Sequence, residues 1–215
     1  VTVSLRIIKK GRIGYATATT LDNAQELVNM AVETAQFGQK AEFQFPSLTP
    51  YHQFRIFDSK VEKVSPETMT KLGDKMIARV LKHTPEMLCE GGVGRSTTTV
   101  SLMNSRGGQA SYKESHFSLG IEAQLVRDTD MLFVGESGSS CRPILETGAI
   151  TEVVLRQLEQ AKKQASVRTK SMPVVFTTQG VASALVSPLI AAFNGKTVLE
   201  GASPIGNKLG QIVFD

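Results

Sequence analysis

Three histidines and two cysteines are the side chains of this 215-residue chain that most often mark a zinc site or a catalytic site. The three histidines, His52, His83 and His116, lie far apart, and none has a His, Cys or Asp neighbour at the spacing of zinc ligands. His83 falls near the C-terminal end of an expected helix, where the helix dipole favours a cation, so a surface role is favoured over a catalytic one. The sequence therefore predicts no catalytic residue, no cofactor-binding residue and no metal ligand in this chain.

The cysteines indicate a reducing compartment. Cys89 and Cys141 are the two cysteines, they are far apart, and their spacing is not that of a metal site. Two reduced thiols in a cytoplasmic protein are the expectation. Residues 1–8 alternate like a strand rather than forming a secretory signal, and no apolar run approaches the roughly 18–20 residues that span a bilayer. The chain is expected to be cytoplasmic, with no membrane partner.

Two short motifs resemble catalytic ones but lack their context. The Glu-Gly-Gly-Val-Gly-Arg-Ser-Thr run at 90–97 resembles a phosphate-binding loop, yet Arg95 stands where that loop needs lysine, and a β pattern follows. Gly-Glu-Ser-Gly at 135–138 resembles the serine segment of trypsin-like proteases, without His and Asp partners in suitable positions. Tyr51 and the aromatic segment 54–57 are expected to serve packing rather than binding.

The most informative stretch is 172–215. The run Pro-Val-Val-Phe-Thr at 173–177 is apolar and β-branched, which predicts a buried strand. A helix is predicted next, because apolar side chains recur every four residues. These are Val181, Leu185, Leu189 and Phe193. Pro188 is expected to kink this helix, or to break it with Ser187 capping a second segment, and Asn194-Gly195 is expected to end it through a left-handed glycine.

This order of elements resembles the TldD/PmbA family, the so-called modulators of DNA gyrase or U62-like peptidases. The resemblance rests on 173–177, on the Ala/Leu-rich helix, and on Asn-Gly-Lys-Thr-Val-Leu-Glu-Gly-Ala-Ser-Pro-Ile-Gly-Asn-Lys-Leu-Gly at 194–210. In the TldD branch, this helix carries a His-Glu-x-x-x-His zinc motif. Here the window 186–191 reads Val-Ser-Pro-Leu-Ile-Ala, and none of these side chains binds zinc well. The chain therefore resembles the PmbA branch, also called TldE, which lacks the motif.

The resemblance covers nearly all of the chain, and the chain resembles an N-terminal and central portion of a family member. The hairpin turn around Gly11 and the Asn-Ser-Arg-Gly turn at 104–107 match family features as well. Three segments are expected: 1–46 as the end of the first family segment, 47–170 as a central α+β segment, and 171–215 as the truncated start of the C-terminal segment.

The predicted fold class is α+β, PmbA/TldD-like, with mixed or antiparallel sheets and three to four helices. A hairpin is predicted over 1–17 and an antiparallel meander over 95–134. Helices are predicted over 21–37, from 65 onward and over 144–166. Capping is expected from an Asp22–Gln25 box with a stop at Gly38, and from Ser65, Pro66 and Glu67 at the second helix. The loop 39–49 is expected to be anchored to the core by Phe43, Phe45 and Pro46.

The charge pattern argues weakly for nucleic acid. The net charge is +4, with basic residues dispersed among 20 acids. A late basic cluster has no interleaved aromatic side chains for base stacking, so a solvated helix face is the better interpretation. The cluster comprises Arg156, Lys162, Lys163, Arg168 and Lys170. Nucleic acid is therefore not an expected partner.

Three functions remain open. The resemblance implies a non-catalytic subunit of a TldD/PmbA-type zinc metalloprotease complex that acts in proteolysis or peptide maturation. Zinc would then be held by a TldD-like partner, in a homo- or hetero-oligomer that encloses a chamber and takes peptide substrates. The alternatives are a regulatory binding protein related to DNA gyrase modulation, and a fragment of a metallopeptidase whose site lies outside this chain.

Overall fold

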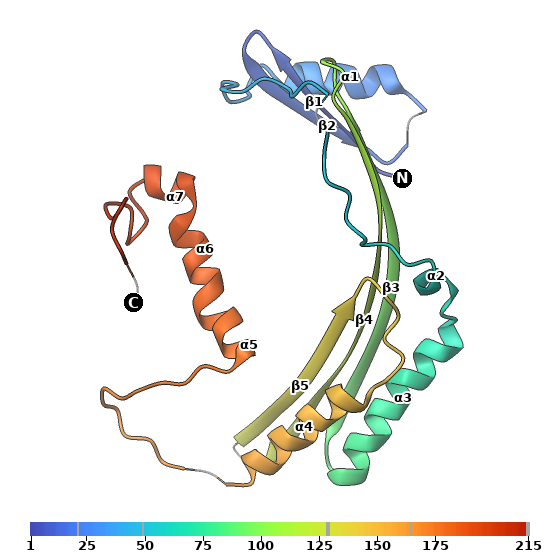
Figure 1. The fold of residues 1–215 in the computed structure, drawn as a ribbon, viewed down its shortest axis with the longest axis vertical. Coiled ribbons are helices and arrows are strands. Elements are labelled where there is room, and N and C mark those ends of the chain that lie inside the picture. The colour runs from blue at the N-terminus through green and yellow to red at the C-terminus, as the bar shows by residue number, and fades with distance from the viewer. Residues whose placement is uncertain (21, 49, 128–129, 164, 214–215) are drawn as a thin grey trace. The chain divides into compact units, whose positions relative to one another are not determined.

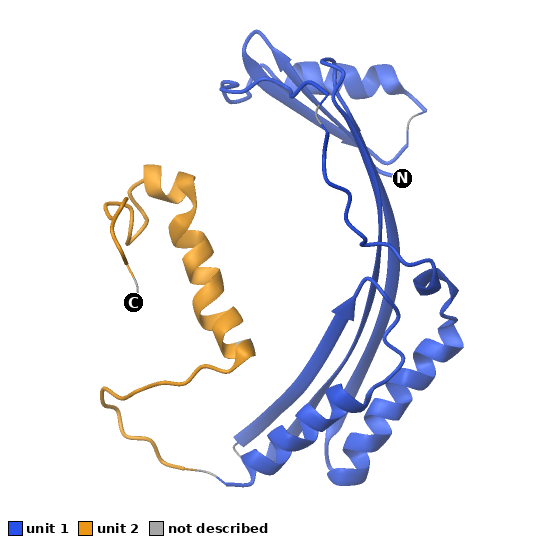
Figure 2. Cartoon of the chain, viewed as in Figure 1, with its two compact units in different colours: residues 1–164 blue, residues 165–215 orange. Residues whose placement is uncertain are grey.

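The computed structural model describes residues 1–20, 22–48, 50–127, 130–163 and 165–213 (Figure 1). The chain divides into two compact units, Val1–Gln164 and Ala165–Asp215 (Figure 2). Its fold is α+β with antiparallel sheets, which confirms the predicted class. Within the described residues, no helix is both long and apolar enough to cross a membrane.

Unit 1 begins with the predicted hairpin. Strand β1, Val3–Lys9, pairs antiparallel with β2, Arg12–Ala18, so that Lys9 faces Arg12 across a two-residue turn. The turn residues Lys10 and Gly11 have φ of 49° and 75°. Positive φ at both central positions is what a type I′ turn needs, and its twist matches that of the two strands.

Helix α1, Ala24–Thr34, packs on this hairpin through unusually close backbone contact. A Cβ added to Gly14 of β2 would lie 1.9 Å from the carbonyl oxygen of Ala31, so only glycine fits there. After the helix, a Cβ on Gly38 would lie 1.7 Å from the carbonyl oxygen of Ile13. Gly38 was expected as a helix stop; the structure shows instead that it lets the returning chain touch β2.

The predicted cap of α1 was wrong by one residue. The Asn23 side chain accepts a hydrogen bond from the Glu26 backbone N–H at 3.1 Å and donates to the Glu26 carboxylate at 3.1 Å. Asn23 is therefore the N-cap, with Glu26 bound to its side chain, and the predicted capping box of Asp22 and Gln25 is not formed. The expected first residue of this helix, Leu21, lies outside the described residues, as do Thr49 of the loop and Gln164 of the third predicted helix.

A three-stranded meander forms the main sheet, as predicted. Its strands are β3, Leu88–Met103, β4, Gln109–Arg127, and β5, Asp130–Ser140, in the order β3-β4-β5 with antiparallel neighbours. The Asn104 side chain shapes the turn between β3 and β4, because its Oδ1 accepts from the backbone N–H groups of Arg106 and Gly108. Within this turn only Gly107 has positive φ, so Asn104 acts through its side chain and not through a left-handed backbone.

Three helices of unit 1 pack against this sheet. They are α2, Lys60–Lys63, α3, Pro66–His83, and α4, Gly148–Ala161, and Figure 1 shows α3 and α4 lying along the sheet. Ser65 caps α3 by accepting from the Thr68 N–H at 3.2 Å, with Pro66 as first helical residue, which confirms that predicted start. The buried core contains Phe117, Leu119, Ile121, Met76, Val80 and Val154.

Two packing expectations in unit 1 were wrong. The buried face of α4 is formed by Ile150, Thr151, Val154 and Leu158. The apolar spacing in the predicted helix 144–166 is only partly a buried face: Val154 and Leu158 are buried as expected, but Ala149 is exposed and Val153 only half-buried. The expected face comprised Ile144, Ala149, Val153, Val154, Leu158, Ala161 and Ala165. Phe43 and Phe45 belong to neither buried cluster; they pack edge to face on each other, with ring centroids 6.1 Å apart. The loop is held instead by polar contacts, because the Asn104 side chain donates to the Pro46 carbonyl at 2.9 Å.

Unit 2 contains α5, Thr178–Val181, the π-helical turn η1, Ala182–Val186, α6, Ser187–Phe193, and α7, Gly195–Leu199. The predicted buried strand at 173–177 is not formed: this segment is irregular, with Val174 64% and Val175 94% exposed. A strand needs a hydrogen-bonding neighbour, and no described strand pairs with these residues.

Candidate functional site

The helical stretch 178–193 is the first candidate site, because the sequence resemblance points to it. Its segments α5, η1 and α6 follow one another without a break. The turn Ala182–Val186 is π-helical and lies just before Pro188, whose missing N–H cannot bond to the carbonyl of Ala184. Ser187 has helical φ and ψ of −63° and −47° and makes no capping bond, so the predicted cap at Ser187 was wrong. The proline is accommodated by a widened turn.

The apolar stripe of this stretch is largely exposed, contrary to expectation. Ile190 is 66% and Phe193 63% exposed, whereas Ala192 is the one buried side chain described in α6. Leu189 is half-buried, so the loss of about 2–5 kcal/mol expected for a fully buried Leu→Ala change does not apply to it. A stripe is buried only where another element covers it, and the described elements of unit 2 that contact α6, which are η1 and α7, leave Ile190 and Phe193 exposed.

The motif after the helix builds a small polar cap. Asn194 is extended, with φ −65° and ψ 122°, and its Oδ1 accepts from the Lys196 N–H at 3.0 Å. Ser203 Oγ donates to the Ala192 carbonyl at 2.7 Å, which ties the family-like segment back to the helix end. The expected left-handed Gly195 was wrong; positive φ occurs instead at Gly201 and Gly210.

The donor set of this stretch does not fit a zinc ion. Residues 178–193 include no His, Cys, Asp or Glu, which are the side chains that bind zinc in proteins. Across the parts of the chain that the structure describes, no three such side chains lie close enough together to hold a metal. No reaction step can therefore be assigned to a metal held by these residues.

The histidines and the two motifs considered in the sequence lie in different elements of the structure. His116 lies in β4, opposite Ser96 of β3, and His52 lies in the irregular segment before α2. The phosphate-loop-like run 90–97 is part of β3, and the protease-like run 135–138 is part of β5, so neither forms a loop. Burial raises the pKa of the half-buried Cys89 thiol, which makes that thiol less reactive.

His83 joins α3 to α4. Its Nε2 lies 2.6 Å from Glu159 Oε1, its Nδ1 lies 2.8 Å from Thr84 Oγ1, and Lys162 Nζ lies 2.5 Å from the same Glu159 oxygen. Hydrogen bonds from Lys162 and then His83 lower the pKa of the Glu159 carboxyl. The structural interpretation of His83 is therefore favoured, with a carboxylate partner that the sequence did not reveal.

We expect the Glu159→Gln variant to be less stable than the wild type at pH 6, and the difference between the two to be smaller at pH 3. A carboxyl whose folded-state pKa is depressed stabilises the fold above its unfolded pKa, and that contribution disappears as the pH falls through the folded pKa. Urea titrations at the two pH values measure it, with Glu86→Gln as an exposed control. If the variant and the wild type differed by the same free energy of unfolding at both pH values, the stabilising role of the ionised Glu159 carboxyl would be contradicted.

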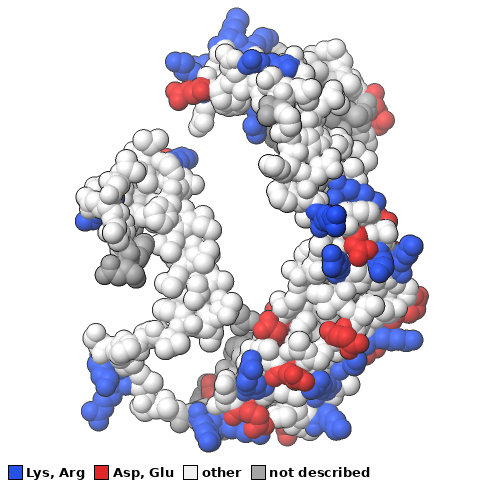
Figure 3. Space-filling view, viewed as in Figure 1, with Lys and Arg blue, Asp and Glu red and all other residues white. Residues whose placement is uncertain are grey.

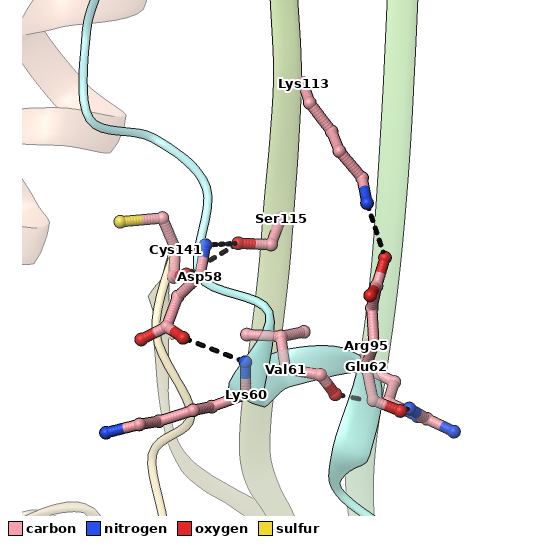
Figure 4. A network of polar contacts seen from close by, with 8 residues as sticks. All are labelled: Asp58, Lys60, Val61, Glu62, Arg95, Lys113, Ser115 and Cys141. Atoms are coloured by element: carbon pink, nitrogen blue, oxygen red, sulfur yellow. Dashed lines mark hydrogen bonds and ion pairs between the residues drawn. The ribbon is translucent and has the colours of Figure 1, made fainter.

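A second polar cluster, which the sequence did not indicate, surrounds the buried Ser115 of β4 (Figure 4). Ser115 Oγ accepts from the Asp58 backbone N–H at 2.8 Å and donates to the Cys141 carbonyl at 2.7 Å. Its own N–H donates to the Ile56 carbonyl at 3.0 Å. One serine thus joins the segment before α2, strand β4 and the residue after β5. The sequence does not indicate that Ser115 joins these segments, because a serine within a predicted strand is common and carries no special pattern.

Charged side chains fix α2 beside this cluster. Lys113 Nζ lies 2.9 Å from Glu62 Oε1 and 4.1 Å from the centroid of the Phe57 ring. The hydrogen bond from Lys113 lowers the pKa of the Glu62 carboxyl. Arg95 Nη1 donates to the carbonyls of Val61 and Glu62 at the end of α2. Arg95, which stood at the lysine position of the phosphate-loop-like motif, therefore has a structural partner.

Both ends of the chain match known protein domains. Residues 1–35 match the family described as PmbA/TldA metallopeptidase domain 1, and residues 169–215 match the PmbA/TldA metallopeptidase C-terminal domain. An uncharacterised protein of Methanocaldococcus jannaschii is 24% identical over 218 residues, which cover 99% of this chain and 49% of that protein.

Two solved structures share the fold. TldE from Thermococcus kodakarensis superposes with a TM-score of 0.79 at 17% identity, over 96% of this chain and 48% of that one. A candidate modulator of a DNA gyrase from Thermotoga maritima gives a TM-score of 0.79 at 17% identity, over 98% of this chain and 49% of that one. The chain thus spans about half the length of the relatives that it matches.

Proposed function

Because this chain carries domains of the PmbA/TldD metallopeptidase family, we propose that it is a non-catalytic subunit of a TldD/PmbA-type zinc metalloprotease complex. The complex would cleave peptides or unfolded chains, in proteolysis or in peptide maturation. Its zinc would be held by a TldD-like partner. This chain would contribute structure and contacts to the assembly.

The observation that carries the proposal is the composition of 178–193. This stretch corresponds to the helix that holds the zinc motif in the TldD branch, yet it has no ligand and no general base among its residues. Alanine, valine and leucine cannot activate a water molecule or polarise a carbonyl. A family member built in this way can act in the complex only through what it packs against.

The surface of unit 2 supports an assembly. No charged residue occurs between Lys170 and Lys196, and the apolar side chains in this interval are mostly exposed. A long uncharged, apolar surface is typical of a protein interface. A TldD-like protein is the partner that the family suggests for it, and a second copy of this chain is the alternative.

A regulatory role related to DNA gyrase is the second candidate function, favoured by the fold shared with the Thermotoga maritima protein. A DNA-binding regulator would need a basic surface that releases counterions, so its binding would weaken steeply with salt. The basic residues of this chain are dispersed. A mobility-shift assay at two salt concentrations separates the two functions, since the metalloprotease subunit requires no DNA binding.

We expect the purified chain to retain no stoichiometric zinc. Without a cluster of ligands in the described residues, a zinc ion would have only weak, single-side-chain contacts and would be lost on dialysis. Elemental analysis of the dialysed chain measures this, and a TldD-like protein treated identically is the positive control. About one zinc per chain after dialysis would refute the proposal for this subunit.

A further inference from the structure

We propose that an open pocket on unit 1 binds a carboxylate that is joined to an apolar group, in the form of a short acidic and hydrophobic peptide segment. We call it the Arg55–Arg142 pocket. Its lining includes Phe54, Arg55, Phe57, Asp58, Lys60 and Arg142. The pocket lies entirely within unit 1 and shares no residue with the stretch 178–193. The inference therefore stands independently of the proposed function.

The pocket has an excess of positive charge without internal partners. Three cations, those of Arg55, Lys60 and Arg142, face one carboxylate, that of Asp58. Among the described residues, none of the three cations has an ion pair, unlike the neighbouring Lys113 with Glu62. Asp58 Oδ1 accepts instead from the Lys60 backbone N–H at 2.8 Å. Figure 3 shows basic side chains gathered over the region of α2.

Hydrogen bonds hold together the two backbone segments that carry the arginines. Ser115 joins the Asp58 N–H and the Cys141 carbonyl through one hydroxyl, so the segments that carry Arg55 and Arg142 are fixed side by side (Figure 4). The Cys141 thiol adds a weak contact to the Arg55 carbonyl at 3.9 Å. A backbone that is already fixed loses less entropy when a ligand binds, and arginine pairs with carboxylates through two parallel hydrogen bonds.

Two aromatic side chains in the lining of the pocket favour a ligand that also carries an apolar group. Phe54 is 77% exposed, which is costly for a large apolar side chain unless something covers it. Phe57 lies beside it in the lining, with Lys113 over its ring. An apolar side chain next to a carboxylate satisfies both halves of the pocket. A nucleic acid fits less well, because Asp58 repels a dense phosphate chain and the pocket offers no continuous basic track.

The test is fluorescence anisotropy with a labelled peptide of sequence Leu-Glu-Phe-Glu-Leu. We expect it to bind the chain, and we expect the Arg55→Gln/Arg142→Gln variant to bind it at least about tenfold more weakly, since two charge-assisted contacts are lost. The control is Arg168→Gln/Lys170→Gln, which removes the same charge from exposed positions in unit 2 and should leave the affinity within about twofold. A peptide with Gln in place of both Glu residues should bind the wild-type chain as weakly as the acidic peptide binds the double-arginine variant.

Three results would overturn the inference. One is equal affinity of the double-arginine variant and the wild type for the acidic peptide. Another is equal loss in the charge-matched control, which would mean attraction by net charge alone. The third is binding of a labelled oligothymidylate but not of the peptide. Circular dichroism melting of each variant accompanies the measurements; the four exchanged side chains are exposed, so folding is expected to be retained.

Discussion

Replacing Phe117 by alanine is expected to lower the free energy of unfolding of unit 1 by about 3–5 kcal/mol. Phe117 is fully buried in the middle of β4, where it belongs to the cluster formed by the sheet with α3 and α4. Removing the ring loses its transfer free energy and leaves a cavity that rigid neighbouring strands cannot close. This is the largest stability effect that we expect from a single side-chain truncation in the chain.

Urea denaturation followed by circular dichroism measures the effect, because the chain has no tryptophan for fluorescence. The matched control is Phe133→Ala, since Phe133 of β5 is the same residue type at 65% exposure. Its loss should stay within about 0.5 kcal/mol. If both variants lost the same free energy of unfolding, the assignment of Phe117 to the buried face of the sheet and of Phe133 to the exposed face would be contradicted.

Much of unit 1 could be predicted from the sequence because local signals and tertiary packing agree there. The turn at Lys10-Gly11 requires positive φ, and Ser65-Pro66 marks a helix start, so both were predicted correctly. Alternating apolar residues predicted the meander for the same reason. The prediction of Asp22 as the cap failed because the neighbouring Asn23 is an equally good capping residue, and only packing decides which of the two caps the helix.

Unit 2 shows why the rest could not be predicted. The run 173–177 has strand propensity, but propensity does not supply a pairing neighbour, and the residues remain irregular. Pro188 predicted an irregular helix, but not that the widened turn would come before it. Because apolar patterning reports only which face can be buried, it did not reveal that Phe193 is exposed in this chain.

The candidate sites differ in the same way. The absence of zinc ligands in 178–193 is a statement about residue types, so it could be made from the sequence. The pairing of His83 with Glu159 and the joining of segments by Ser115 connect residues 76 and 57 positions apart, respectively. Single-sequence reasoning has no signal for such contacts. The Arg55–Arg142 pocket was missed for the same reason, because its two arginines come from distant segments.

The central claim is that this chain belongs to a metalloprotease complex without performing its chemistry. We expect the isolated chain to have no peptidase activity at all, because a helix without a zinc ligand or a general base cannot support even weak zinc catalysis. The partner that we propose is a TldD-like protein with the His-Glu-x-x-x-His motif. The chain should bind it, and the zinc of the partner should account for all turnover.

The most direct measurement is peptide hydrolysis by the isolated chain, by the TldD-like partner, and by their mixture, each with and without a chelator. We predict no turnover by the isolated chain, even with added zinc, and chelator-sensitive turnover by the mixture that exceeds that of the partner alone. Chelator-sensitive turnover by the isolated chain would contradict the account.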